Sequence, residues 1–159
     1  MKMKSVCFTG HRNVKKTIEL KKSLFEQLVK LIDEGADVFY AGGAVGWDML
    51  CERAIIELRE KYPHIKLHLV LPCPAEEQTA KWSESDKREF MELLSAADMV
   101  EVCSEHYYDG CMKLRNQRLV NLADVCVCYY NESNKRNGTG QTVRMAERQG
   151  KEIINLVEA

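Results

Sequence analysis

Three glycine-containing segments hold most of the residues of this sequence that could bind an anion. They are Gly10-His11-Arg12, the run from Gly42-Gly43-Ala44-Val45-Gly46 to Trp47-Asp48, and Asn137-Gly138-Thr139-Gly140. Because glycine has no Cβ, the backbone at these points can take a positive φ and approach a ligand closely. A helix that starts after such a loop presents unpaired N–H groups and the positive end of its dipole, which favour a phosphate or carboxylate.

Polar side chains next to these loops extend the same chemistry. Arg12 and Arg115 offer forked hydrogen bonds to phosphate oxygens, and Thr139 offers a hydroxyl. Asp48 or Asn116 would hydrogen-bond a sugar or a base. The predicted ligand-binding residues are Gly10, His11, Arg12, Gly42, Gly43, Gly46, Asp48, Arg115, Asn116, Gly138 and Thr139.

Each of these residues also has a plainer structural interpretation. A glycine-rich turn can simply let a helix pack on a sheet, and Asp48 can be a first-turn acid that the helix dipole favours. His11 can order a loop, Arg115 can form a surface salt bridge, and Trp82 can pack at a loop edge rather than close over a ligand. Three such loops at one sheet edge favour the ligand over these alternatives.

The elements that must position these residues alternate between strand and helix. Short apolar runs predict strands at 5–9, 37–41, 66–71, 98–102, 124–130 and 152–157. Amphipathic spacing predicts helices at 17–34, 47–62, 112–122 and 139–149, and a polar loop that becomes a helix over 75–94. The pattern predicts an α/β fold: one Rossmann-like domain over 1–159, with a mostly parallel sheet of five to six strands and helices on both faces. In such a sheet, ligands bind at the carboxyl ends of the strands, where the glycine loops lie.

Composition narrows the classes of partner and compartment. The 23 basic and 24 acidic residues leave a net charge of −1, which disfavours a nucleic acid as the main partner. No targeting segment opens the chain and no apolar run approaches the ~20 residues that span a bilayer, so we expect a cytoplasmic protein without a membrane partner. The seven cysteines are interpreted as reduced thiols in the core. Cys103, His106 and Cys111 match no common zinc spacing and lack a fourth ligand, so no metal is predicted.

The motifs resemble the SLOG superfamily, which joins DNA-processing protein A with the LOG-type proteins. Thr9-Gly10-His11-Arg12 and the run from Gly42 to Asp48 carry the resemblance, which is greatest to the small, bacterial YpsA-like branch of unknown function. The pattern continues through Gln78 and Trp82, Arg115-Asn116, Gly138-Thr139 and Ala146. The resemblance implies a Rossmann-like fold, a nucleotide-related ligand of the NAD or ADP-ribose type and, as in relatives that often pair, a homo-oligomer. Neither the Gly-x-Gly-x-x-Gly fingerprint nor a Walker loop is present, and no cofactor is indicated beyond such a nucleotide.

The two better-understood relatives supply the alternative functions. LOG-type proteins cleave an N-glycosidic bond with an Arg and a Glu; Arg115 could stand for the Arg, but the Glu position falls on Thr142, which cannot supply a carboxylate. A nucleotide N-glycosidic hydrolase would then need another catalytic set, such as Asp48 or His11. DNA-processing protein A resembles the chain in Arg115-Asn116-Gln117-Arg118-Leu119, yet no basic patch interleaved with aromatics points to single-stranded DNA. The sequence thus favours the binding or sensing of a phosphate-bearing nucleotide derivative, with Gln78 and Trp82 closing over it.

Overall fold

A single six-stranded parallel sheet forms the centre of the computed structural model, which describes residues 4–132 and 138–157. Its strands are β1 (Lys4–Gly10), β2 (Ala36–Ala41), β3 (Lys66–Leu71), β4 (Met99–Val102), β5 (Val125–Tyr129) and β6 (Glu152–Asn155). Their order across the sheet is β4-β3-β2-β1-β5-β6, and every neighbouring pair is parallel. The chain therefore builds outward from β1 to β4 and then returns to the other side of β1. The order reverses between β1 and β5, as in a Rossmann-like fold.

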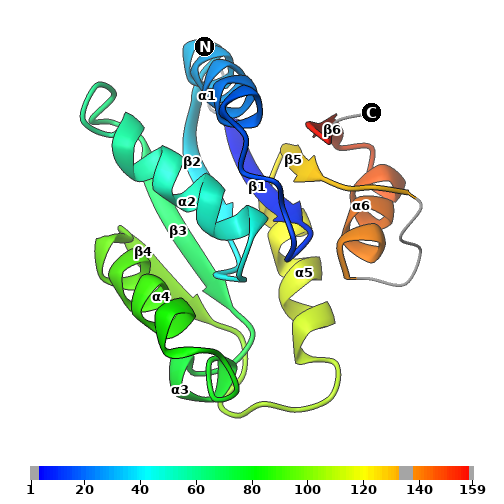
Figure 1. Cartoon of the computed structure of the whole chain (residues 1–159). Coiled ribbons are helices and arrows are strands. Elements are labelled where there is room, and N and C mark those ends of the chain that lie inside the picture. The colour runs from blue at the N-terminus through cyan, green and yellow to red at the C-terminus, as the bar shows by residue number, and fades with distance from the viewer. Residues whose placement is uncertain (1–3, 133–137, 158–159) are drawn as a thin grey trace.

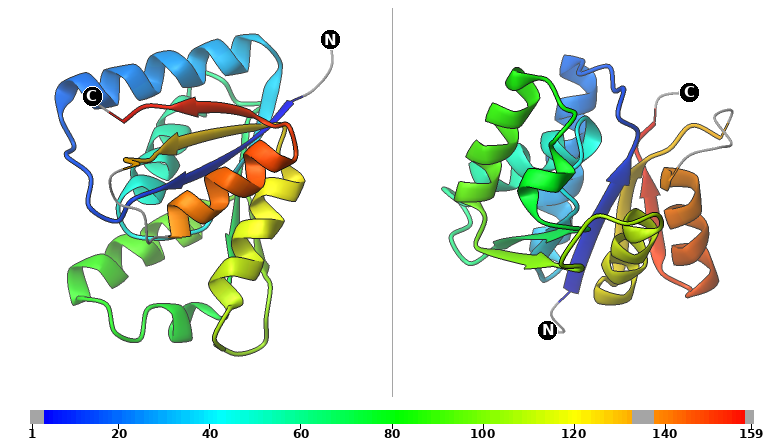
Figure 2. Two further views of the ribbon diagram at one scale, coloured as in Figure 1. Left: turned by 90° about the vertical axis from the view of Figure 1, so that its right-hand side faces the viewer. Right: turned by 90° about the horizontal axis from the view of Figure 1, so that it is seen from below.

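Helices cover both faces of this sheet (Figures 1 and 2). The helices are α1 (Ile18–Asp33), α2 (Trp47–Leu58), α3 (Ala75–Gln78), α4 (Glu84–Ala96), α5 (Cys111–Leu122) and α6 (Gly138–Arg148). Seen from below in Figure 2, α1, α2 and α4 lie on one face, and α5 and α6 lie on the other. The predicted α/β class, with a parallel sheet between two helical layers, is confirmed.

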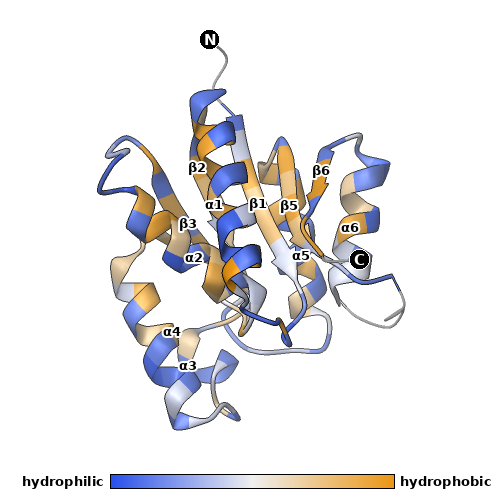
Figure 3. Cartoon of the chain, turned by 45° about the horizontal axis from the view of Figure 1, so that its top comes forward, coloured by the Kyte–Doolittle hydropathy of each residue, from blue (hydrophilic) through white to orange (hydrophobic). Residues whose placement is uncertain are grey.

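Two apolar clusters fill the space between sheet and helices. The larger includes Phe8 and Phe39 of the sheet, whose rings stack at 6.1 Å, together with Leu24 of α1 and Phe90 of α4. The smaller joins Cys7, Cys126 and Cys128 of the sheet to side chains of α5 and α6. Figure 3 shows the corresponding hydropathy, with hydrophobic central strands and helices that alternate between hydrophobic and hydrophilic residues. All seven cysteines are free thiols, and six of them are buried, as the apolar runs predict.

Local capping explains where the helices begin and end. The Thr17 hydroxyl accepts a hydrogen bond from the Leu20 amide at 3.0 Å, which starts α1 one residue after the predicted boundary. The prediction that the second helix runs to residue 62 is wrong, because α2 ends at Leu58. The chain turns after Leu58, whose carbonyl accepts hydrogen bonds from both the Lys61 amide and the Tyr62 amide.

The polar stretch 75–94 differs most from its prediction. It contains two helices rather than one loop leading into a helix. The Ser83 side chain accepts from the Asp86 amide at 3.1 Å and fixes the start of α4. Within the described ranges, no helix combines the length and apolar character that crossing a bilayer requires.

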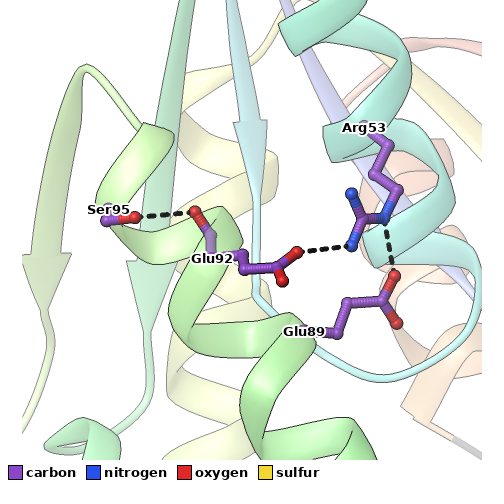
Figure 4. Close-up of polar contacts among 4 residues, drawn as sticks. All are labelled: Arg53, Glu89, Glu92 and Ser95. Atoms are coloured by element: carbon purple, nitrogen blue, oxygen red, sulfur yellow. Dashed lines mark hydrogen bonds and ion pairs between the residues drawn. The ribbon is translucent and has the colours of Figure 1, made fainter.

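An ion-pair cluster, shown in Figure 4, joins α4 to α2. Arg53 donates from Nε to Glu89 at 2.6 Å and from Nη2 to Glu92 at 3.2 Å. The Ser95 hydroxyl donates to the Glu92 carbonyl at 2.9 Å. The Arg53 side chain is 48% exposed, so water screens these pairs. They orient the two helices more than they stabilise the fold.

Candidate functional site

A pocket of about 760 Å³ opens at the carboxyl ends of β1 and β5, where the strand order reverses. This is the position at which open parallel sheets bind their ligands. Eight of the eleven predicted residues line it: Gly10, His11, Arg12, Asp48, Arg115, Asn116, Gly138 and Thr139. The fold thus brings together side chains that lie more than 100 positions apart in the sequence.

The other three predicted residues, Gly42, Gly43 and Gly46, are absent from the pocket lining and serve the packing of their loop. A Cβ on Gly42 would overlap the guanidinium of Arg115. Gly46 has φ +96°, and a Cβ there would overlap the carbonyl of Arg12. Among these loop residues, Ala44 is the one that reaches the pocket wall together with Asp48.

Arg115 is buried, with 5% of its surface exposed, so the interpretation as a surface salt bridge is wrong. Its Nη1 donates to the carbonyl of Gly42 at 2.6 Å, and its Nε donates to Asn116 Oδ1 at 2.8 Å. Burial lowers the pKa of Arg115, but a guanidinium remains protonated in proteins. The side chain therefore places a fixed positive charge at the pocket wall and pins the glycine loop to α5.

Asp48 bonds the same loop from the first turn of α2. Its Oδ2 accepts from the Gly42 amide at 3.2 Å and from the Ala44 amide at 3.3 Å. Burial raises the pKa of Asp48 to about 6, although the charge of Arg115 and the two amides oppose the shift. Because the carboxylate already accepts from these two amides, the loop does not present them to a ligand.

Glu52 was not among the predicted residues. It lies one helical turn after Asp48, has 0% exposure, and neither of its carboxyl oxygens has a hydrogen-bond partner. Nearby, Gln78 donates from Nε2 to the carbonyl of Gly43 at 3.4 Å, while its Oε1 is also buried without a partner. Burial and the charge of Asp48 raise the pKa of Glu52 well above its usual value. Its spacing of four from Asp48, on the apolar side of an amphipathic helix, was the available signal.

His11 connects three elements around the pocket. Its Nε2 accepts from the Asn131 amide at 2.8 Å, and its own amide donates to the carbonyl of Tyr129 at 3.2 Å. Its carbonyl accepts from the Trp47 amide at 3.2 Å. Burial lowers the pKa of His11, which suits a neutral ring whose Nε2 is an acceptor. These contacts match the interpretation of His11 as a loop-ordering residue.

Arg12 and Trp82 meet at the rim. The Arg12 guanidinium lies 5.9 Å from the centroid of the Trp82 ring, and that ring packs edge-on against Phe90 at 5.5 Å. Arg12 is exposed and lines the pocket, whereas Trp82 does not line it. Trp82 is therefore a packing residue, and its ring contacts the Arg12 guanidinium.

The start of α6 forms the opposite wall, through Gly138 and Thr139. Thr142 is wholly buried and its hydroxyl donates to the Gly138 carbonyl at 2.8 Å, so it neither reaches the pocket nor replaces a carboxylate. Asn137, the first residue of the predicted loop, lies outside the described residues. In the described ranges, no three His, Cys, Asp or Glu side chains gather in a way that could hold a metal ion.

Comparison with known families decides what this architecture represents. A family model described as the YspA SLOG family matches residues 6–158. The chain belongs to this family. Among curated relatives, a UPF0398 protein of Halalkalibacterium halodurans is 28% identical over 141 residues, which cover 82% of this chain and 74% of the relative. Another, from Shouchella clausii, is 33% identical over 119 residues that cover 73% of this chain, and the match spans only 62% of that relative.

Two solved structures share the fold of this chain. DNA processing protein A from Helicobacter pylori, studied for its single-stranded DNA binding, aligns with a TM-score of 0.63 at 19% identity, over 94% of this chain and 63% of that one. TM1055, a structural genomics target, aligns with a TM-score of 0.59 at 18% identity, over 95% of this chain and 72% of that one. At these identities the likeness establishes the fold.

Proposed function

We propose that this YspA SLOG chain binds or senses a nucleotide-derived, phosphate-bearing small molecule of the NAD or ADP-ribose type. The observation that carries the proposal is one pocket, at the switch in strand order, whose lining includes Arg12, Arg115, Asn116 and the first turn of α6. Its volume of about 760 Å³ is within the range of roughly 300–1,000 Å³ that is usual for small-molecule sites.

Different residues of the pocket lining favour different parts of such a ligand. The start of α6, with Thr139 and the nearby Arg115, favours a phosphate through its helix dipole and a guanidinium. Asp48 is an acceptor that repels phosphate and suits the hydroxyls of a ribose. Met112, Leu119 and Tyr129 add apolar surface for a base.

Thermal stability measured against a nucleotide panel tests this proposal. The panel contains AMP, ADP, ATP, NAD, ADP-ribose and ribose 5-phosphate. A ligand at ~100 times its Kd stabilises by roughly 2.7 kcal/mol, which shifts the unfolding midpoint by several degrees. No shift with any member would refute the nucleotide proposal.

Two arginines on α5 provide a matched pair of variants. Arg115→Lys keeps the charge but loses the fork, so ligand affinity should fall about 10- to 100-fold, since a hydrogen bond to a charged group contributes about 1.5–3 kcal/mol. Arg118→Lys is the control, because Arg118 pairs with Glu101 at 2.8 Å outside this pocket. Equal ligand affinities of the two variants would show that Arg115 does not bind the ligand.

A nucleotide N-glycosidic hydrolase is the second candidate, and the Asp48 carboxyl favours it. A carboxyl at the pocket wall whose pKa lies about 6 suits proton transfer near neutral pH. Release of free base from AMP or NAD, abolished by Asp48→Asn, would support turnover. Binding of single-stranded DNA with a steep salt dependence would instead transfer the function of the H. pylori neighbour to this chain.

A further inference from the structure

Two buried carboxyls, one at the pocket wall and one behind it, lie in the field of one cation. Asp48 and Glu52 are four residues apart on α2, so they lie on one side of the helix. Asp48 is 5% exposed and reaches the pocket, and Glu52 is fully buried behind it. Arg115 acts on both carboxyls from α5. Its Nη1 and Nε already donate to the Gly42 carbonyl and to Asn116.

The remaining charged and titratable groups around the pair do not supply a second buried cation. Glu89 of α4 acts on Glu52 and adds negative charge, and the Arg53 that pairs with Glu89 is 48% exposed, so water screens it. Cys51 of α2 and Cys126 of β5 are thiols whose pKa values are raised, so they stay neutral. In the loop after β1, His11 lines the pocket as a neutral ring, and Arg12 lies at the exposed rim over Trp82.

Glu52 therefore holds a proton at neutral pH: neither of its buried oxygens has a hydrogen-bond partner among the described residues, and the Gly43 amide offsets only part of the effect of burial. A buried carboxylate without a partner costs far more free energy than a buried carboxylic acid. Asp48, by contrast, keeps its negative charge against two amides and the field of Arg115. The pair thus holds one proton and one negative charge at neutral pH.

We propose that Asp48 and Glu52 together take up one further proton when a phosphate-bearing ligand enters the pocket. The inference rests on the proposed function. A phosphate beside Arg115 adds negative charge next to Asp48 and competes for the one guanidinium that stabilises it. Protonation of the pair relieves this repulsion and leaves a neutral hydroxyl that can donate to the ligand.

The direction of the pH effect follows from linkage. The bound state holds more protons than the free state, so affinity is greatest at low pH. It then falls by up to about tenfold for each pH unit above the free-state pKa, until the bound-state pKa is passed. Because the pKa of Asp48 in the free protein is about 6, the fall begins near pH 6.

Titration calorimetry with ADP-ribose and with NAD measures the uptake directly. The pyrophosphate groups of both probes stay ionised from pH 6 to 8, so neither probe takes up protons of its own. Binding heats in Pipes and in Tris, which differ in ionisation enthalpy, give the number of protons that the complex takes up. We expect between half a proton and one at pH 7 in the wild-type chain, with affinity that weakens as the pH rises.

Three variants identify the residues that take up the proton. Asp48→Asn with Glu52→Gln should abolish it, whereas Glu52→Gln alone should retain it, because Asp48 can still accept the proton. Glu101→Gln, which removes an exposed acid outside the pocket, should match the wild type. Binding of either probe by the wild type with zero proton uptake overturns this inference alone, even if the double variant does not fold. An unchanged uptake in a folded double variant also overturns it, and no binding of either probe overturns it while the full nucleotide panel decides the proposed function.

Discussion

Replacing Gly42 with alanine tests the contact that joins the glycine loop to α5. The added Cβ would overlap the guanidinium of Arg115, which donates to the carbonyl of this same residue. Gly42 is not among the glycines with a positive φ, so alanine meets no backbone strain there. The flexible end of the arginine can move away, and the main effect is then the loss of its hydrogen bond.

The expected destabilisation follows from the loss of the buried hydrogen bond between Arg115 and the Gly42 carbonyl. A hydrogen bond to a charged group contributes about 1.5–3 kcal/mol, and alanine returns roughly 0.4–1 kcal/mol by restricting the unfolded chain. We therefore expect Gly42→Ala to destabilise the fold by about 0.5–2.6 kcal/mol, which corresponds to a lowering of Tm of roughly 1–10 °C for a chain of this length. Urea denaturation and calorimetry measure both quantities.

Gly138→Ala is the matched control. A Cβ there would meet Asn116 Nδ2 at 3.6 Å, an ordinary contact, and alanine favours the helix. Its stability should equal or exceed that of the wild type. In an Arg115→Met background, Gly42→Ala should cost much less, because the bond is already gone. A Gly42→Ala chain as stable as the Gly138→Ala chain, or an equal cost in both backgrounds, would refute the reasoning.

Three further predictions concern groups away from this contact. Glu52→Gln should flatten the dependence of the free energy of unfolding on pH. The folded wild type holds a proton that the unfolded chain has lost, so its stability falls as pH rises above about 4.5. Urea unfolding at pH 5 and pH 8 measures this, and an equal fall in the wild type and the variant would contradict it. Thr142→Glu should destabilise by several kcal/mol without creating base release, because the position is fully buried; a folded variant that hydrolyses AMP would contradict this. Arg53→Ala should cost no more than about 1 kcal/mol, and the cost should shrink in high salt; a larger, salt-independent loss would mean that its pairs with α4 are not screened.

The sheet could be predicted from the sequence because its signals are local. Continuous apolar runs marked the strands, and helical spacing between them required parallel pairing. The pocket could also be placed, since strand ends in such a sheet meet at one edge. The end of α2 was missed because the apolar spacing continues past Leu58 to Tyr62, whereas the Glu60 and Lys61 amides bond carbonyls three residues back and interrupt the helix.

The roles of individual residues were harder to predict than their positions. Glycine gives the same signal whether it admits a ligand or a neighbouring side chain, so Gly42 and Gly46 were predicted as binding residues although they make room for Arg115 and for the 11–12 backbone. Arginine is usually found at the surface, and the burial of Arg115 depends on the Gly42 carbonyl 73 positions away. Glu52 was missed because an acid on a helix is normally exposed.

The burial of Trp47 makes the protein its own optical sensor. Trp47 is wholly buried, its indole donates to the Val127 carbonyl at 3.3 Å, and its ring lies 5.4 Å from that of Tyr129 at the pocket. The chain has only one other tryptophan, Trp82, at the rim under Arg12. Trp82→Phe therefore leaves Trp47 as the single tryptophan, beside the Tyr129 ring that lines the pocket. When tryptophan alone is excited, its emission wavelength can follow ligand entry without any attached dye.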